Sequence, residues 1–160
     1  MLVALGVVTL WLGSILSMLE LSVAVLASLF AVLAVLEYGK SAPWLVYAAT
    51  AILSLLLLPQ KAPALAYTLF FGYYPIVKEK LERLPLLAAW LLKEGIFHVS
   101  LILLYGLYTY LLSPGAREPL WYLALILILA EVTFVLYDMA LTRIITLYLF
   151  RWRDRFRFKK

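Results

Sequence analysis

The sequence predicts an all-α integral membrane protein, a bundle of about six transmembrane helices with both termini in the cytoplasm. Apolar residues make up 66% of the 160 residues and charged residues only 14%, and the mean hydropathy is +1.01. Soluble domains are about half apolar and about a quarter charged. The composition therefore excludes a soluble globular enzyme and a disordered tail, and the lack of cysteine excludes a disulfide scaffold.

Six apolar segments are separated by charged residues, proline or glycine. A helix needs roughly 20 apolar residues to cross ~30 Å of hydrocarbon, where helices satisfy their own backbone groups. We expect spans at about 2–18, 21–38, 43–58, 63–77, 86–112 and 119–150. Pro43, Pro63 and Pro119 lie near helix starts, where a missing amide costs least. Pro75 lies inside the fourth segment and should kink or end it.

Basic residues predict the orientation, because cytoplasmic loops are enriched in Lys and Arg. With six spans and an inner N-terminus, only Lys61 and Arg117 lie outside. The cytoplasmic basic residues are then Lys40, Lys78, Lys80, Arg83, Arg151, Arg153, Arg155, Arg157, Lys159 and Lys160. We expect a multipass protein of the bacterial cytoplasmic membrane. Residues 1–150 form its transmembrane domain and residues 151–160 a basic and aromatic cytosolic tail.

Small residues follow one face of the second segment, at Ala24, Ala27, Ala31 and Ala34. Such a face lets membrane helices approach closely. An internal helix–helix contact is favoured over a face that docks a partner.

Basic and acidic residues alternate over residues 78–84, just before Pro85. The pattern predicts a cytosolic amphipathic helix between the fourth and fifth spans. A solvated connector is favoured over a docking element.

Ionisable residues occur within the last two segments, where they are costly and usually face the protein interior. They are Lys93, Glu94, His98, Glu131, Asp138 and Arg143. At ~1.5 Å per residue, His98 lies ~16 Å deep and Glu131 is also near the midplane. Consecutive antiparallel helices would bring His98 to Glu131 and Lys93 to Asp138.

These charges have two interpretations that the sequence leaves open. In the first interpretation, the charges neutralise one another and fix the helix register, with Lys93 and Asp138 as a structural ion pair. Alternatively, Glu94, His98, Glu131 and Asp138 bind a cation, a proton or a small solute between the helices.

Catalytic motifs are missing from the sequence, which has no glycine-rich phosphate loop, no HExxH and no GxSxG pattern. Ser100 is two residues from His98 and points to a different helix face. Glu94 and His98 resemble half of a di-metal bundle motif, which needs further inward carboxylates. We expect no enzyme, no cofactor and no metal site.

Residues 151–160 are the densest charged run, with six basic and three aromatic residues. Each basic residue is worth about 1 kcal/mol at an anionic leaflet, and arginine with aromatic residues also suits phosphates and unpaired bases of RNA. The lipid interpretation is favoured on composition. The candidate residues for RNA or anionic lipid are Arg143, Arg151, Arg153, Arg155, Arg157, Lys159, Lys160, Trp152, Phe156 and Phe158.

Several motifs resemble those of a family of small, mostly uncharacterised membrane proteins from Gram-positive bacteria. The motifs are Phe70-Phe-Gly-Tyr-Tyr-Pro-Ile-Val-Lys78, Glu82-Arg83 and Glu131…Tyr137-Asp138…Arg151-x-Arg153. In size, span number and topology the chain also resembles the S components of energy-coupling-factor transporters. That resemblance implies a six-helix, non-enzymatic solute receptor that docks on transporter coupling subunits, although the first segment has no clear Ala-x-x-x-Ala docking motif.

The chain is more weakly similar to the membrane protein that associates with OLE RNA. It has Asp138-x-x-x-Thr142 and Arg151-x-Arg153 where that family has an Asp-x-x-x-Asp pattern and an arginine pair. This resemblance implies a membrane anchor that holds a structured RNA through the tail. A homo-oligomer and a structural subunit of a larger membrane complex are further alternatives.

Overall fold

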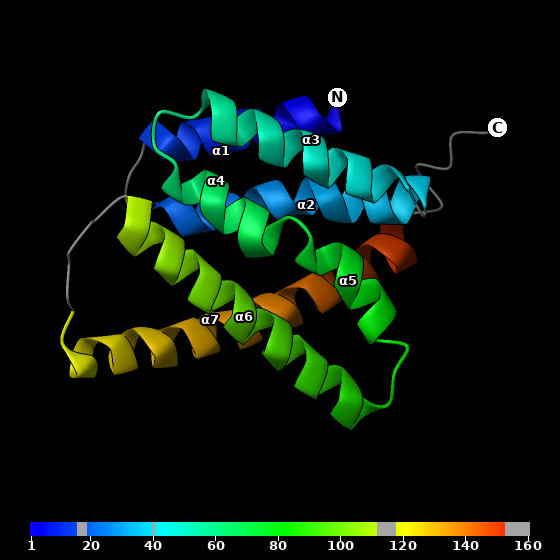
Figure 1. Cartoon of the computed structure of the whole chain (residues 1–160). Helices are drawn as coiled ribbons and strands as arrows, with labels where there is room; N and C mark the ends of the chain where they lie inside the picture. Colours follow the sequence, from blue (N-terminus) through cyan, green and yellow to red (C-terminus); the bar gives the residue numbers. More distant parts are fainter. Residues whose placement is uncertain (16–18, 40, 112–117, 153–160) are drawn as a thin grey trace. The chain divides into compact units, whose positions relative to one another are not determined.

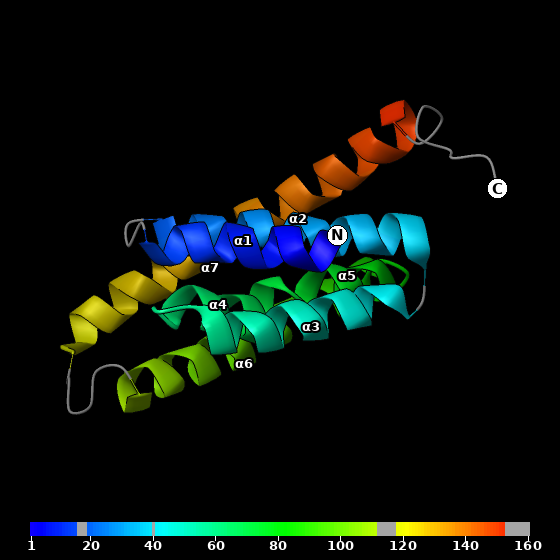
Figure 2. The same cartoon turned by 90° about the horizontal axis from the view of Figure 1, so that it is seen from above.

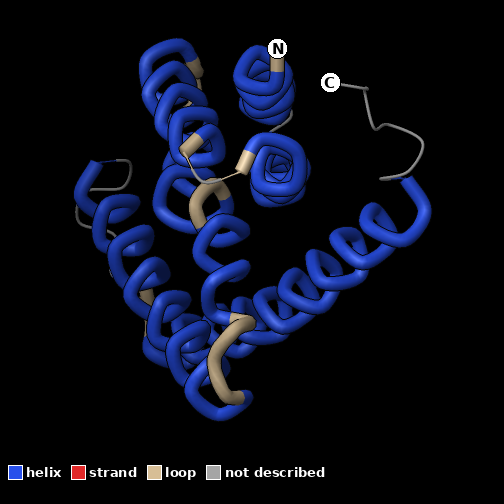
Figure 3. The backbone as a smooth tube through the Cα atoms, turned by 90° about the vertical axis from the view of Figure 1, so that its right-hand side faces the viewer, coloured by secondary structure: helices blue, strands red, loops and turns tan. Residues whose placement is uncertain are grey.

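The computed structural model describes residues 1–15, 19–39, 41–111 and 118–152. These residues are almost entirely helical, and none of them lies in a strand (Figure 1, Figure 3). The predicted all-α class is therefore confirmed. The chain divides into two compact units, residues 1–115 and residues 116–160.

Three helices form the first part of unit 1: α1 (Leu2–Ile15), α2 (Glu20–Tyr38) and α3 (Ala42–Leu57). Each contacts the other two, and they lie side by side in both views (Figure 1, Figure 2). Pro43 lies in the first turn of α3. There its missing amide breaks no helical hydrogen bond, as predicted.

The alanine stripe of α2 lies in the interior of unit 1. Ala24, Ala27, Ala31 and Ala34 have no exposed surface. A Cβ added to Gly13 of α1 would lie 2.6 Å from the Cβ of Val23 on α2, so the two backbones approach closely. The stripe therefore serves internal helix packing, as the sequence favours.

The fourth apolar segment is broken. It consists of α4 (Ala62–Ala66), a π-helical turn η2 (Tyr67–Phe71) and α5 (Tyr74–Leu81). In η2 the amide of Gly72 donates to the carbonyl of Tyr67, five residues back, at 2.7 Å. Pro75 lies in the first turn of α5, since it has no amide to continue the preceding helix. The prediction that Pro75 would kink or end this segment is confirmed.

Unit 1 ends with α6 (Leu86–Leu111), and the described part of unit 2 is α7 (Leu120–Leu147) with a π-helical turn η3 (Tyr148–Trp152). Pro119 is the N-cap of α7, as its position predicts.

Three helices of the described residues are long and apolar enough to cross a membrane: Glu20–Tyr38, Leu86–Tyr110 and Leu120–Phe150. The apolar helices α1 and α3 have 14 and 16 residues. At ~1.5 Å per residue they extend only ~21 and ~24 Å, against ~30 Å of hydrocarbon. Length and composition thus support three of the six predicted spans.

Candidate functional site

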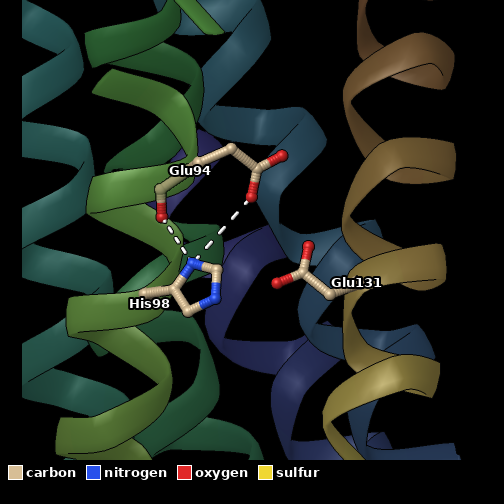
Figure 4. A group of neighbouring side chains, drawn as sticks. All are labelled: Glu94, His98 and Glu131. Atoms are coloured by element: carbon tan, nitrogen blue, oxygen red, sulfur yellow. Dashed lines mark hydrogen bonds and ion pairs between the residues drawn. The ribbon is translucent and has the colours of Figure 1, made fainter. Parts of the chain in front are cut away.

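Glu94 and His98 lie one turn apart on α6, on the same face, as their spacing predicts. His98 Nδ1 is 2.9 Å from the backbone oxygen of Glu94 and 3.9 Å from its carboxylate Oε2 (Figure 4). The two side chains are 45% and 34% exposed. Because a carbonyl oxygen only accepts, Nδ1 is the donor in this contact.

This pair therefore offers a carboxylate and an imidazole nitrogen, two groups that bind protons or cations. Both come from a mostly apolar helix whose other polar side chains include Lys93 and Ser100. In hydrocarbon such groups are costly and usually functional.

Unit 2 carries the other half of the predicted site. Glu131 is half-buried and Asp138 is buried. Asp138 shares one stripe of α7 with the helix's other least exposed residues, Phe134, Tyr137 and Leu141. Its backbone oxygen accepts a hydrogen bond from Thr142 Oγ1 at 3.0 Å. Figure 4 draws Glu131 as a residue of α7. The predicted pairs His98–Glu131 and Lys93–Asp138 each join residues of different units, and they stay predictions.

A cluster of charges that the sequence did not predict lies between α5 and the beginning of α6. Glu82 Oε1 is 2.7 Å from Lys78 Nζ and 3.7 Å from Lys93 Nζ. The Lys78 side chain is fully buried and that of Lys93 is 7% exposed, whereas Glu82 is 41% exposed. Lys93 Nζ also lies 5.4 Å from the ring centre of Trp90, a cation–π geometry.

The segment is amphipathic, as predicted, but the favoured solvated connector does not hold for Lys78, whose side chain is fully buried. Its helix, α5, packs against α2 and α6, which covers one face. The opposite face is solvated, because Glu79 and Arg83 form an ion pair of 2.7 Å with side chains 51% and 74% exposed. The alternation of charges in the sequence does not tell which of these pairs is buried.

Hydroxyl groups join the elements of unit 1 across its interior. Tyr47 of α3 donates to the backbone oxygen of Thr68 at 2.7 Å. Ser100 of α6 donates to the backbone oxygen of Ile96 at 2.7 Å, so its oxygen accepts the 2.6 Å hydrogen bond from the Tyr73 hydroxyl. Ser100 thus holds the broken segment to α6. No sequence motif indicated these contacts.

The tail residues of the RNA or lipid prediction lie at the edge of the described chain. Arg143 is exposed on α7, and Arg151 and Trp152 belong to η3. The rest lie outside the described residues: Arg153, Arg155, Phe156, Arg157, Phe158, Lys159 and Lys160.

No family model, curated protein or solved structure matches the chain. The resemblances to the Gram-positive membrane family, to the S components and to the OLE-RNA-associated protein stay predictions from the sequence.

Proposed function

We propose that the protein is a non-enzymatic receptor of the bacterial cytoplasmic membrane that binds a small cation, or a solute with a cationic group, within the membrane. The observation that carries the proposal is the contact of Glu94 with His98 in the middle of α6. An acidic side chain and an imidazole in hydrocarbon mark proton, ion or solute sites by default.

The membrane location is supported by three apolar helices of spanning length among the described residues. The asymmetry of the basic residues supports six spans with both termini in the cytoplasm. In this topology α1, α3 and the broken segment contribute the shorter crossings. They would need local thinning of the bilayer or flanking residues that reach the interface, each at a modest cost.

Glu131 and Asp138 are proposed as further binding residues from their positions along α7. The depth of Glu131 matches that of His98 in the predicted topology, and both carboxylates favour a positively charged ligand. A receptor of this kind needs a partner to complete transport. The sequence resemblance to S components suggests transporter coupling subunits for that role.

His98 gives a direct test because it is the only histidine of the chain. The full-length protein is labelled with 15N-histidine and reconstituted in nanodiscs. The imidazole 15N signals are recorded with sodium, potassium, ammonium or methylammonium chloride, at the same ionic strength as a choline chloride reference. We expect at least one of these cations to shift the His98 signals.

Glu94→Gln should abolish this shift because it removes the carboxylate charge beside His98. The matched control is Glu79→Gln on α5, which removes an exposed carboxylate and should leave the shift unchanged. Signals that no cation moves relative to choline, or that move equally in Glu94→Gln, would contradict the proposal.

A further inference from the structure

The three packed helices of unit 1 measure the thickness of the bilayer that this unit fits. Because α1, α2 and α3 lie side by side (Figure 1, Figure 2), each of them crosses the same apolar layer. The described part of α1 extends ~21 Å and α3 extends ~24 Å. On α2 the carboxylates of Glu20 and Glu37 are ~26 Å apart along the helix axis. All three lengths are below the ~30 Å of a typical hydrocarbon core.

Lys61 distinguishes between the two ways in which a short helix adapts to a bilayer. A lysine that reaches a distant interface extends its side chain away from the hydrocarbon. Lys61 instead turns back along α3, where its Nζ donates to the carbonyls of Leu55 at 2.8 Å and Leu58 at 2.7 Å. A helix leaves carbonyls at this end without an internal partner. The ammonium therefore marks the level at which α3 ends.

Gln60 joins the neighbouring helices to this level. Its amide nitrogen faces two acceptors and donates to Glu20 Oε1 at 2.9 Å and to the carbonyl of Ser14 at 3.2 Å. Ser14 lies in the last turn of the described part of α1, and Glu20 is the first residue of α2. Polar groups of all three helices thus form one layer at this end of unit 1.

The opposite end of the three helices is equally well defined. The chain reverses between Tyr38, the last residue of α2, and Ala42, the first of α3, so neither helix has residues that extend further. Tyr38 and Trp44 are exposed there, and aromatic residues favour the membrane interface. Both ends of the apolar layer are therefore fixed by the fold.

Long and short helices respond differently to a thin bilayer. The 26 residues of α6 extend ~39 Å, and a helix of this length fits a thin bilayer by tilting. A short helix cannot lengthen, and α1, α2 and α3 are held to one another by their contacts. The short helices therefore determine the thickness that costs least.

We propose that unit 1 fits, and locally imposes, a hydrocarbon thickness of about 25 Å on the surrounding lipid. The contact surface is the set of exposed apolar side chains of α1 and α3, which includes Leu5, Val8, Leu12, Leu45, Ile52 and Leu56. The inference rests on the membrane location in the proposed function and not on the cation site.

The full-length protein is reconstituted in vesicles of one phosphatidylcholine at a time. The acyl chains are dimyristoleoyl, dipalmitoleoyl, dioleoyl, dieicosenoyl or dierucoyl, in order of increasing thickness. Thermal unfolding followed by circular dichroism should give the highest Tm in one of the two thinnest bilayers, and a Tm lower by at least about 4 °C in the thickest. A Tm that does not depend on chain length, or that is highest in dioleoyl or longer lipid, would overturn this inference alone. Protein that an alkaline carbonate wash extracts from every vesicle would overturn the membrane location as well.

Lys61→Met tests the assigned end of the apolar layer. In thin bilayers water reaches the carbonyls of Leu55 and Leu58, whereas thicker lipid leaves them without a partner in hydrocarbon, which is costly. The loss of Tm relative to the unaltered protein should therefore grow with acyl length. The matched control, Arg83→Gln, removes an exposed charge of the connector, and its loss of Tm should be the same in every lipid. An equally constant loss for Lys61→Met would overturn the proposal, and the lipid series of the unaltered protein decides it if this variant does not fold.

Discussion

The two ion pairs of α5 give a controlled test of how burial changes the effect of a charge. Lys78–Glu82 and Glu79–Arg83 are both i,i+4 pairs of 2.7 Å that join the last turn of α5 to the residues just after it. They differ in surroundings, because Lys78 is fully buried whereas Arg83 is 74% exposed. Glu82→Gln and Glu79→Gln each remove one negative charge and keep the shape of the side chain.

The expected effects differ in size. Removing one partner of a buried pair destabilises a protein by roughly 3–5 kcal/mol, because the other charge stays buried. Glu82 is 41% exposed, so water already screens its carboxylate, and Lys78 and Lys93 have further interactions. We therefore expect Glu82→Gln to cost about 2 kcal/mol, or about 4–8 °C in Tm for a chain of this size. An exposed pair contributes ~0–1 kcal/mol, so Glu79→Gln should lower the Tm by at most about 4 °C.

Thermal unfolding of the full-length protein in detergent, followed by circular dichroism, measures both shifts. A third variant, Lys78→Met, removes the buried ammonium and leaves the half-exposed Glu82 to water. It should therefore lower the Tm by less than Glu82→Gln. Equal shifts for the two glutamate variants, or a larger one for Glu79→Gln, would refute the reasoning that burial of Lys78 makes its pair the more important.

Two further predictions concern packing and the tail. Gly72→Ala places a Cβ 2.7 Å from a ring carbon of Tyr67 and should destabilise by about 1–3 kcal/mol in thermal unfolding, whereas Gly95→Ala meets nothing within 4 Å and should leave the Tm unchanged or raise it. Deleting residues 151–160 should leave the cation-induced shift of His98 unchanged. RNA that co-purifies with the full chain, is lost on this deletion and is released between about 50 and 200 mM salt would favour the RNA-anchor function.

The helices were predictable because hydropathy and helix breakers act locally. Six apolar segments mark where the chain is helical, and Pro75 marks where the fourth segment breaks. The π-helical turn before Pro75 was not predictable, because it depends on how Tyr67 and Gly72 pack against α3. Helix lengths also changed the interpretation, since the described parts of α1 and α3 have 14 and 16 residues, fewer than the roughly 20 that cross the hydrocarbon.

The candidate site was predictable to the extent that its contacts are local in sequence. Glu94 and His98 are four residues apart on one helix, and their contact follows from helix geometry. The contact of Lys93 with Glu82, the C-cap residue of α5, joins two segments of the chain and was not predicted. Estimates of membrane depth from the sequence assume that a connector between two spans is solvated. They therefore miss a charged side chain such as Lys78, which the fold buries.

The same distinction separates the polar groups inside unit 1. Ser54 and Thr9 satisfy their hydroxyls within their own helices, and any apolar helix would allow that. The hydroxyls of Tyr47 and Tyr73 are satisfied only by elements distant in sequence, so each fixes one position of the broken segment. Apolar packing alone tolerates sliding between helices, whereas a buried hydrogen bond is lost by a shift of an ångström or two. These two hydrogen bonds therefore set the position of the broken segment against α3 and α6 more sharply than apolar contact alone.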